Sequence, residues 1–129
     1  MPSPQAAPAD ILLVDDSMCC RQSIGFALRR AGHQVREASS ADAALRELER
    51  TGQPKVCIVD HIMADLDGAC LIHILRQRPD TTHTAMVLMS TVETNYLRAL
   101  AREVGAHAWL AKPFAPEQLL AIVSILLDR

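Results

Sequence analysis

The sequence reads Val56-Cys57-Ile58-Val59-Asp60 near its middle, four apolar residues in a row followed by an acid. An unbroken apolar run of this length is typical of a strand that is buried on both faces of a parallel sheet. A helical pattern precedes it from Ala41 to Arg50 and closes at Gly52. A loop containing Asp67-Gly68 and another helical pattern follow it, and that helix must end before Pro79. This stretch therefore predicts a buried strand between two helices.

The same alternation extends outward in both directions. Buried strands are expected at Ile11–Val14 and Met86–Met89, an edge strand in the polar stretch 34–38 around Val35, and a last strand at Ala108–Ala111. The remaining helices are expected at Ser17–Ala31 followed by Gly32, at Thr94–Val104 followed by Gly105, and after Pro116, which suits a first helical turn. Five strands alternating with five helices predict an α/β fold: a parallel sheet with right-handed crossovers and helices on both faces.

Composition limits what the chain can do. Its 129 residues are enough for one domain, which we expect at residues 10–129 after a flexible tail at residues 1–9. A formal net charge of −2 gives no electrostatic footprint for nucleic acid or for an anionic membrane. No apolar run approaches the roughly 20 residues that span a bilayer, and the N-terminus lacks the pattern of a secretory signal. We therefore expect a cytoplasmic protein.

Chemically complementary groups follow four of the predicted strands. Asp15-Asp16 follow the first, Asp60 the third, Ser90 the fourth and Lys112 the fifth. The carboxyl ends of parallel strands meet at one edge of the sheet, which is where open α/β sheets bind ligands. Crowded carboxylates repel one another, so a cation is expected among them, and oxygen ligands with open positions suit Mg²⁺.

An aspartate can attack phosphorus to give an acyl phosphate. With a metal at Asp15 and Asp16, Asp60 remains as the nucleophile, while Ser90 and Lys112 are placed to hold the other phosphoryl oxygens. We therefore expect Asp60 to accept a phosphoryl group as a covalent switch and not as the nucleophile of a turnover enzyme.

From Asp10 to the C-terminus the sequence resembles the receiver domain of bacterial response regulators. The pieces that carry the resemblance are Leu12-Leu13-Val14-Asp15-Asp16-Ser17, Asp60-His61-Ile62-Met63, Asp67-Gly68, Ser90 and Lys112-Pro113-Phe114. The resemblance implies a flavodoxin-like, doubly wound sheet with strand order 2-1-3-4-5. It also implies that Lys112-Pro113 is a cis peptide.

The resemblance further implies a mechanism. A sensor histidine kinase or a histidine phosphotransfer protein would donate a phosphoryl group to Asp60. The metal, Mg²⁺ or Mn²⁺, would be held by Asp60, directly by Asp16, mainly through water by Asp15, and by the backbone carbonyl of Ile62. Ser90 would then move toward the phosphoryl group, and the aromatic residue before the lysine, Trp109, would move inward.

Three positions depart from the family pattern. Ala64 stands where a proline is usual, which should loosen the loop after Asp60, and Ala115 gives the last helix a weak N-cap. Trp109 replaces a tyrosine or phenylalanine, and two interpretations of it stay open: a switching residue, or a residue that only packs. The rim positions Ile62 and Val92 are apolar and Thr91 is comparatively large, so they should orient water poorly and slow the loss of phosphate.

Signalling would proceed by docking a downstream output protein. The final helix carries more apolar positions than one core-facing stripe needs, so a homodimer through this helix and the Thr94–Val104 helix is a further possibility. Alternatives from other classes also stay open: a pseudo-receiver that binds partners without phosphorylation, a flavin module, and an aspartyl phosphatase of the haloacid-dehalogenase type. The phosphatase pattern fits less well, because its two acids are separated by two positions whereas Asp15 and Asp16 are adjacent.

Overall fold

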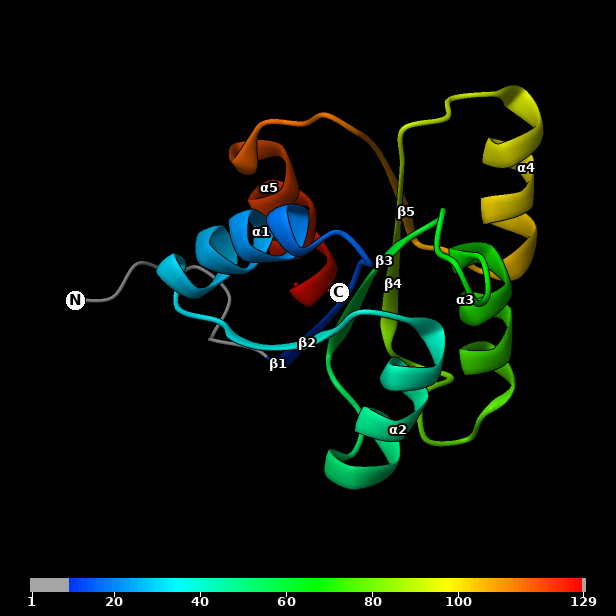
Figure 1. Cartoon of the computed structure of the whole chain (residues 1–129), viewed down its shortest axis with the longest axis horizontal. Coiled ribbons are helices and arrows are strands. Elements are labelled where there is room, and N and C mark those ends of the chain that lie inside the picture. Colours follow the sequence, from blue (N-terminus) through cyan, green and yellow to red (C-terminus); the bar gives the residue numbers. More distant parts are fainter. Residues whose placement is uncertain (1–9, 129) are drawn as a thin grey trace.

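The computed structural model describes residues 10–128 and contains a five-stranded parallel sheet with helices on both faces (Figure 1). The strands are β1 (Asp10–Val14), β2 (Gln34–Ala38), β3 (Val56–Asp60), β4 (Ala85–Ser90) and β5 (Ala108–Ala111). The helices are α1 (Met18–Arg30), α2 (Ala41–Thr51), α3 (Gly68–Gln77), α4 (Asn95–Val104) and α5 (Pro116–Leu127). The strand order β2-β1-β3-β4-β5 confirms the predicted topology. The predicted tail at residues 1–9 lies outside the described residues.

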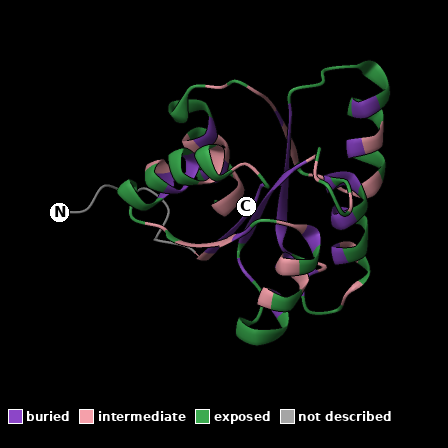
Figure 2. Ribbon diagram, in the orientation of Figure 1, coloured by how far each residue is buried: buried purple, intermediate pink, exposed green. Residues whose placement is uncertain are grey.

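The sheet separates two apolar layers, as expected from strands that are buried on both faces (Figure 2). Cys57 and Val59 of β3 point into the layer formed with α2, α3 and α4. The alternate residues Val56 and Ile58 point into the layer formed with α1 and α5. All of β3 is buried, so its last residue, Asp60, carries a carboxylate into a largely enclosed position.

The helix ends follow local rules. Ser17, Ser40, Asp67 and Thr94 each accept a hydrogen bond from a backbone N–H of the first turn of the helix that follows. The α5 helix has no such cap at Ala115, as predicted, although the Gln118 side chain accepts a hydrogen bond from the Ala115 N–H at 2.9 Å. Gly105 ends α4 in the left-handed conformation, which glycine adopts at no steric cost.

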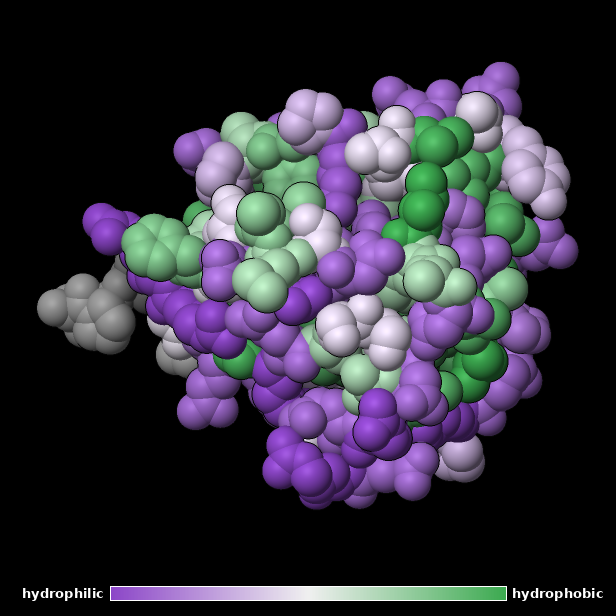
Figure 3. Space-filling model, in the orientation of Figure 1, coloured by the Kyte–Doolittle hydropathy of each residue, from purple (hydrophilic) through white to green (hydrophobic). Residues whose placement is uncertain are grey.

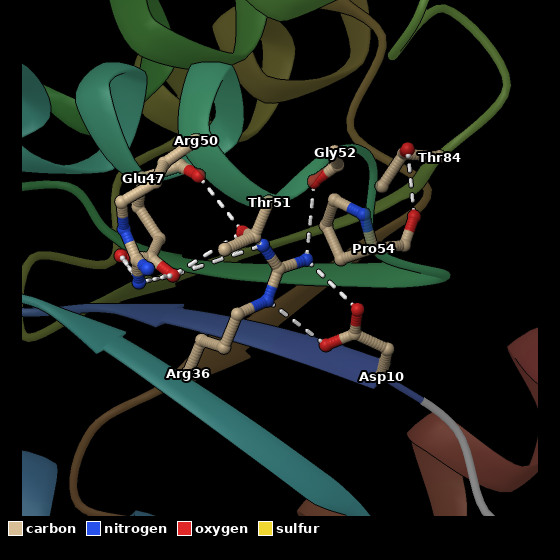
Figure 4. Close-up of polar contacts among 8 residues, drawn as sticks. All are labelled: Asp10, Arg36, Glu47, Arg50, Thr51, Gly52, Pro54 and Thr84. Atoms are coloured by element: carbon tan, nitrogen blue, oxygen red, sulfur yellow. Dashed lines mark hydrogen bonds and ion pairs between the residues drawn. The ribbon is translucent and has the colours of Figure 1, made fainter.

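A closed polar network joins β1, β2 and α2 at the amino edge of the sheet (Figure 4). The Arg36 guanidinium donates to both carboxylate oxygens of Asp10, at 3.0 and 2.9 Å, and lies 3.8 Å from Glu47. It also contacts the Thr51 hydroxyl and donates to the Gly52 carbonyl oxygen. This network ties the polar edge strand β2 to the body of the domain.

Hydrophilic residues dominate the surface over α2 on the face seen in Figure 3. Large apolar side chains are exposed elsewhere, on α1, α3, α4 and α5 and beside the carboxyl edge of the sheet: Met18, Phe26, Ile62, Ile74, Val92, Tyr96 and Ile125. None of the helices within residues 10–128 combines the length and apolar character that crossing a bilayer requires.

Candidate functional site

Three carboxylates meet at the carboxyl edge of the sheet. Asp15 and Asp16 follow β1, and Asp60 is the last residue of β3, the neighbouring strand. Each offers an oxygen that lies within 4.8 Å of the oxygens of the other two. Asp15 is fully buried and Asp60 is 7% exposed, whereas Asp16 is exposed to solvent. The predicted acidic cluster is therefore formed.

Lys112 reaches this cluster from the end of β5. Its Nζ donates to Asp15 Oδ2 at 2.7 Å and lies 3.2 Å from Asp60 Oδ1. The peptide bond between Lys112 and Pro113 is cis, as predicted. The other Asp15 carboxylate oxygen accepts the Ser17 backbone N–H at 2.9 Å, so both oxygens of Asp15 already have protein partners.

The electrostatics of the site favour a bound cation. Burial raises the pKa of the Asp60 carboxyl, and the charge of Asp15 raises it further, while Lys112 opposes both effects. Burial lowers the pKa of the Lys112 ammonium, but its hydrogen bond and ion pair with Asp15 and its attraction to Asp60 outweigh that effect. One ammonium therefore does not neutralise three carboxylates, and an oxygen-only donor set of this kind fits Mg²⁺ or Mn²⁺.

Ser90 lies at the end of β4 and is fully buried. Its hydroxyl oxygen accepts the Val92 backbone N–H at 2.9 Å, so in this conformation the side chain braces its own loop. Val92 is 41% exposed and Ile62, on the loop after β3, is 52% exposed. These two predicted rim residues therefore present apolar side chains to solvent, and the exposed Thr91 lies between Ser90 and Val92.

Trp109 lies on β5 and packs against the apolar layer on the α2–α3–α4 side. Its indole N–H is buried and has no hydrogen-bond partner among the described residues. The Arg98 guanidinium of α4 lies 5.9 Å from the centre of the ring, and the same arginine contacts Glu93 in the β4–α4 loop. The structure thus places Trp109 in a packing role between β5 and α4, and its predicted switching role remains a prediction.

A groove of about 380 Å³ adjoins the lysine side of the site, between α1 and the start of α5. Its lining is mostly apolar and includes Ile24, Phe114 and Leu119, together with Cys20 and Lys112.

Two residues between β3 and the first turn of α3 have roles that the sequence reasoning missed. The Asp65 carboxylate accepts the backbone N–H groups of Ala41 and Asp42, at 3.2 and 3.0 Å, across 24 and 23 residues of sequence. A Cβ atom at Gly68 would lie 2.4 Å from the Asp60 carbonyl oxygen, so only glycine lets α3 begin this close to β3. The sequence pattern predicts a loop at Asp67-Gly68, but no pattern marks Asp65.

Comparison with known proteins gives one consistent result. The sequence model of the response regulator receiver domain matches residues 11–124. The transcriptional regulatory protein GltR of Pseudomonas aeruginosa is 33% identical over 119 residues, which are 92% of this chain and 49% of GltR. The transcriptional regulator NtrC of Azospirillum brasilense is 35% identical over 116 residues, 89% of this chain and 23% of NtrC. The chain thus spans about half the length of the curated relatives it matches, or less.

Solved structures agree. The chemotaxis protein CheY4 of Vibrio cholerae superposes with a TM-score of 0.87 at 30% identity, covering 93% of this chain and 99% of CheY4. A putative response regulator from Chloroflexus aurantiacus superposes with a TM-score of 0.89 at 31% identity, covering 95% of this chain and 100% of that protein's chain.

Proposed function

The chain belongs to the family of response regulator receiver domains of two-component systems, and from this premise we propose that it accepts a phosphoryl group on Asp60. The observation that carries the proposal is the setting of that carboxylate. It is nearly buried at the end of β3, lies 3.2 Å from Lys112 Nζ, and shares a 4.8 Å cluster with Asp15 and Asp16.

The donor would be a phosphohistidine of a sensor kinase or a phosphotransfer protein. An Asp60 carboxylate oxygen attacks phosphorus, the P–N bond to the donor imidazole breaks, and that nitrogen leaves with the bonding electrons and is protonated. Lys112 offsets charge on the phosphoryl oxygens, and Ser90 releases the Val92 N–H and donates its own O–H to a phosphoryl oxygen. The receiver is thus modified once and does not turn over substrate.

A bound Mg²⁺ or Mn²⁺ would offset the charge that the phosphoryl group and the carboxylates bring together. Asp16, which is exposed, and Asp60 would be its direct ligands. Asp15 would act mainly through water, since its oxygens already accept from Lys112 and from the Ser17 N–H. The Ile62 backbone carbonyl would complete the protein ligands.

The rim residues bear on how long the acyl phosphate lasts. Hydrolysis needs a water molecule oriented at phosphorus, and the exposed Ile62 and Val92 side chains offer it no hydrogen-bonding group. We expect slow self-dephosphorylation. Loss of the phosphoryl group from the isolated protein within seconds would contradict this part of the proposal.

The output would be read by a partner. Phosphorylation would move Ser90 and then Trp109, changing the face formed by α4, β5 and α5, to which a downstream protein or a second copy of the chain docks. Tyr96 of α4 and Ile125 of α5 are both exposed and would supply apolar contacts to such a partner. We propose the cytoplasm as the place of action, because that is where such kinase donors present their phosphohistidine.

The test is incubation with Mg²⁺ and acetyl phosphate, followed by intact-protein mass spectrometry. We expect a mass gain of one phosphoryl group that Asp60→Asn abolishes and that chelation of the metal prevents. No gain in the wild-type protein, either from acetyl phosphate or from a phosphorylated histidine donor, would favour a phosphorylation-independent interaction module instead. Steady hydrolysis of aryl phosphates would favour an aspartyl phosphatase.

A further inference from the structure

The β3–α3 loop is anchored to the start of α2 by one exposed side chain. Oδ1 of Asp65 accepts the Ala41 N–H at 3.2 Å and also the Leu66 N–H of its own loop at 2.9 Å. Oδ2 accepts the Asp42 N–H at 3.0 Å. These backbone hydrogen bonds hold the pKa of the Asp65 carboxyl below its ordinary value, so the side chain is charged when it makes them.

The first turn of α2 is thereby capped from two places. Its own N-cap residue, Ser40, accepts the Ala43 N–H at 3.0 Å, while Asp65 accepts the two N–H groups before it. The Ser40 cap is local to α2. The Asp65 cap joins α2 to the loop that carries Ile62, and α2 and α3 cover the same face of the sheet (Figure 1).

The two ends of the loop are held in other ways. The His61 N–H donates to the Met89 carbonyl oxygen of β4, and the Gly68 N–H donates to the His61 carbonyl oxygen, both at 2.8 Å. In the middle, Met63 and Leu66 pack against the apolar layer, but apolar packing does not fix the direction of a carbonyl group. Among the described residues, hydrogen bonds from another element reach positions 62–66 only at Asp65.

We propose that Asp65 is a positioning residue that fixes the β3–α3 loop so that the Ile62 carbonyl and the Asp60 carboxylate stay in place for the metal. The proposal rests on the metal site proposed above. A proline at position 64 would stiffen the loop through its fixed φ. Here the hydrogen bonds of the Asp65 carboxylate stiffen the loop instead. Ala64 gives the loop no such constraint.

The test compares Asp65→Ala with Ser40→Ala as a matched control. Each variant removes a cap from the same turn of α2, but only Asp65→Ala frees the loop. We expect both to lower the denaturation midpoint. Only Asp65→Ala should weaken Mg²⁺ binding, by about tenfold in calorimetric titration, and slow phosphoryl uptake from acetyl phosphate.

Two further variants grade the effect. Adding Ala64→Pro to Asp65→Ala should restore part of the Mg²⁺ affinity. Asp65→Asn keeps one acceptor oxygen, so its Mg²⁺ affinity should lie between those of wild type and Asp65→Ala.

Equal Mg²⁺ affinities for Asp65→Ala and Ser40→Ala would overturn the proposal, as would a wild-type protein that binds no Mg²⁺. If Asp65→Ala fails to fold, the comparison of Asp65→Asn with Ser40→Ala decides in the same way. A wild-type protein that binds Mg²⁺ but takes no phosphoryl group would contradict the proposed function, whereas the Mg²⁺ comparison would still decide the role of Asp65.

Discussion

The amino and carboxyl edges of the sheet carry the same kinds of charged residue, but the charges serve different purposes at the two edges. At the amino edge, the acids Asp10 and Glu47 face the bases Arg36 and Arg50, and the network is closed by hydrogen bonds (Figure 4). At the carboxyl edge, three carboxylates cluster, and the Lys112 ammonium pairs with two of them, those of Asp15 and Asp60. Strand β1 connects the two, because Asp10 begins it and Asp15 follows its end.

This difference separates charges that hold the fold from charges that bind. In a balanced cluster each charge already has a partner, so we assign the amino-edge network to holding β2 in place. In an unbalanced and nearly buried cluster, the charged carboxylates raise the free energy of the folded protein, and a bound cation lowers it. The raised pKa of Asp60 reflects this unfavourable energy of the charged form. Four changes test this division, in order of decreasing expected effect.

The largest effect is expected from Lys112→Met. The variant removes the cation that pairs with the Asp15 and Asp60 carboxylates, so the phosphoryl oxygens lose their charge partner and uptake from acetyl phosphate should slow by about 100-fold. Mass spectrometry over a time course measures the rate. Uptake within a factor of about two of wild type would show that the ammonium has no part in the chemistry.

Next comes Arg36→Met at the opposite edge. The arginine side chain is 16% exposed. Its loss leaves Asp10 without an ion-pair partner and leaves Glu47 paired with Arg50 alone, while methionine keeps the apolar contacts of the stem. We expect a loss of about 2 kcal/mol in the free energy of unfolding, since the pairs are only partly buried. Urea denaturation measures it. Phosphoryl uptake should be unchanged, and a large fall in uptake would break the division between the edges.

A smaller effect of opposite sign is expected from Asp60→Asn without Mg²⁺. Removing one of the crowded charges should raise the free energy of unfolding by about 1 kcal/mol at neutral pH. Because the folded-state pKa of Asp60 is raised above 3.8, its favourable contribution is present below that pH and is lost as the pH rises through the raised pKa.

The difference between wild type and Asp60→Asn should therefore grow with pH over that window. Denaturation at several pH values, with and without Mg²⁺, measures it, and Mg²⁺ should shrink the difference because it binds and stabilises the wild type more strongly. A wild-type protein that stays more stable than the variant at neutral pH without Mg²⁺ would contradict the imbalance.

The smallest effect is expected from Arg46→Ala on the outer surface of α2. Arg46 pairs with Asp42 at 3.1 Å, but the two side chains are 73% and 72% exposed. Solvent screening leaves such a pair worth less than about 0.5 kcal/mol. The change in denaturation midpoint should be close to the error of the method. A loss as large as that of Arg36→Met would mean that pairing alone, without burial, stabilises this domain.

Most of the architecture could be predicted from the sequence, because apolar runs and helix caps are local signals. The strand at Ala108–Ala111 was predicted with its observed bounds, and the helices begin within a residue or so of their predicted starts at Ser17, Ala41 and Thr94. The carboxyl-edge residues Asp15, Asp60 and Lys112 could be predicted as well, since topology alone brings the ends of parallel strands together.

What could not be predicted depends on distances between elements. Arg36 appeared only as part of a polar edge strand, and its pairing with Asp10 requires the register of β1 against β2. The Asp65 carboxylate bonds from the β3–α3 loop to the start of α2, and no sequence pattern around Asp65 predicts these hydrogen bonds. The hydroxyl of Ser90 faces the Val92 N–H, a local conformation that strand pattern does not encode.

Trp109 is the single tryptophan of the chain. Its ring lies between β5 and the guanidinium of Arg98, with its N–H enclosed. The native protein therefore carries its own fluorophore, and every photon of indole emission comes from the junction of β5 and α4. A binding event at the acidic cluster that displaces this junction becomes visible in an unlabelled sample, and one that leaves it unmoved is optically silent.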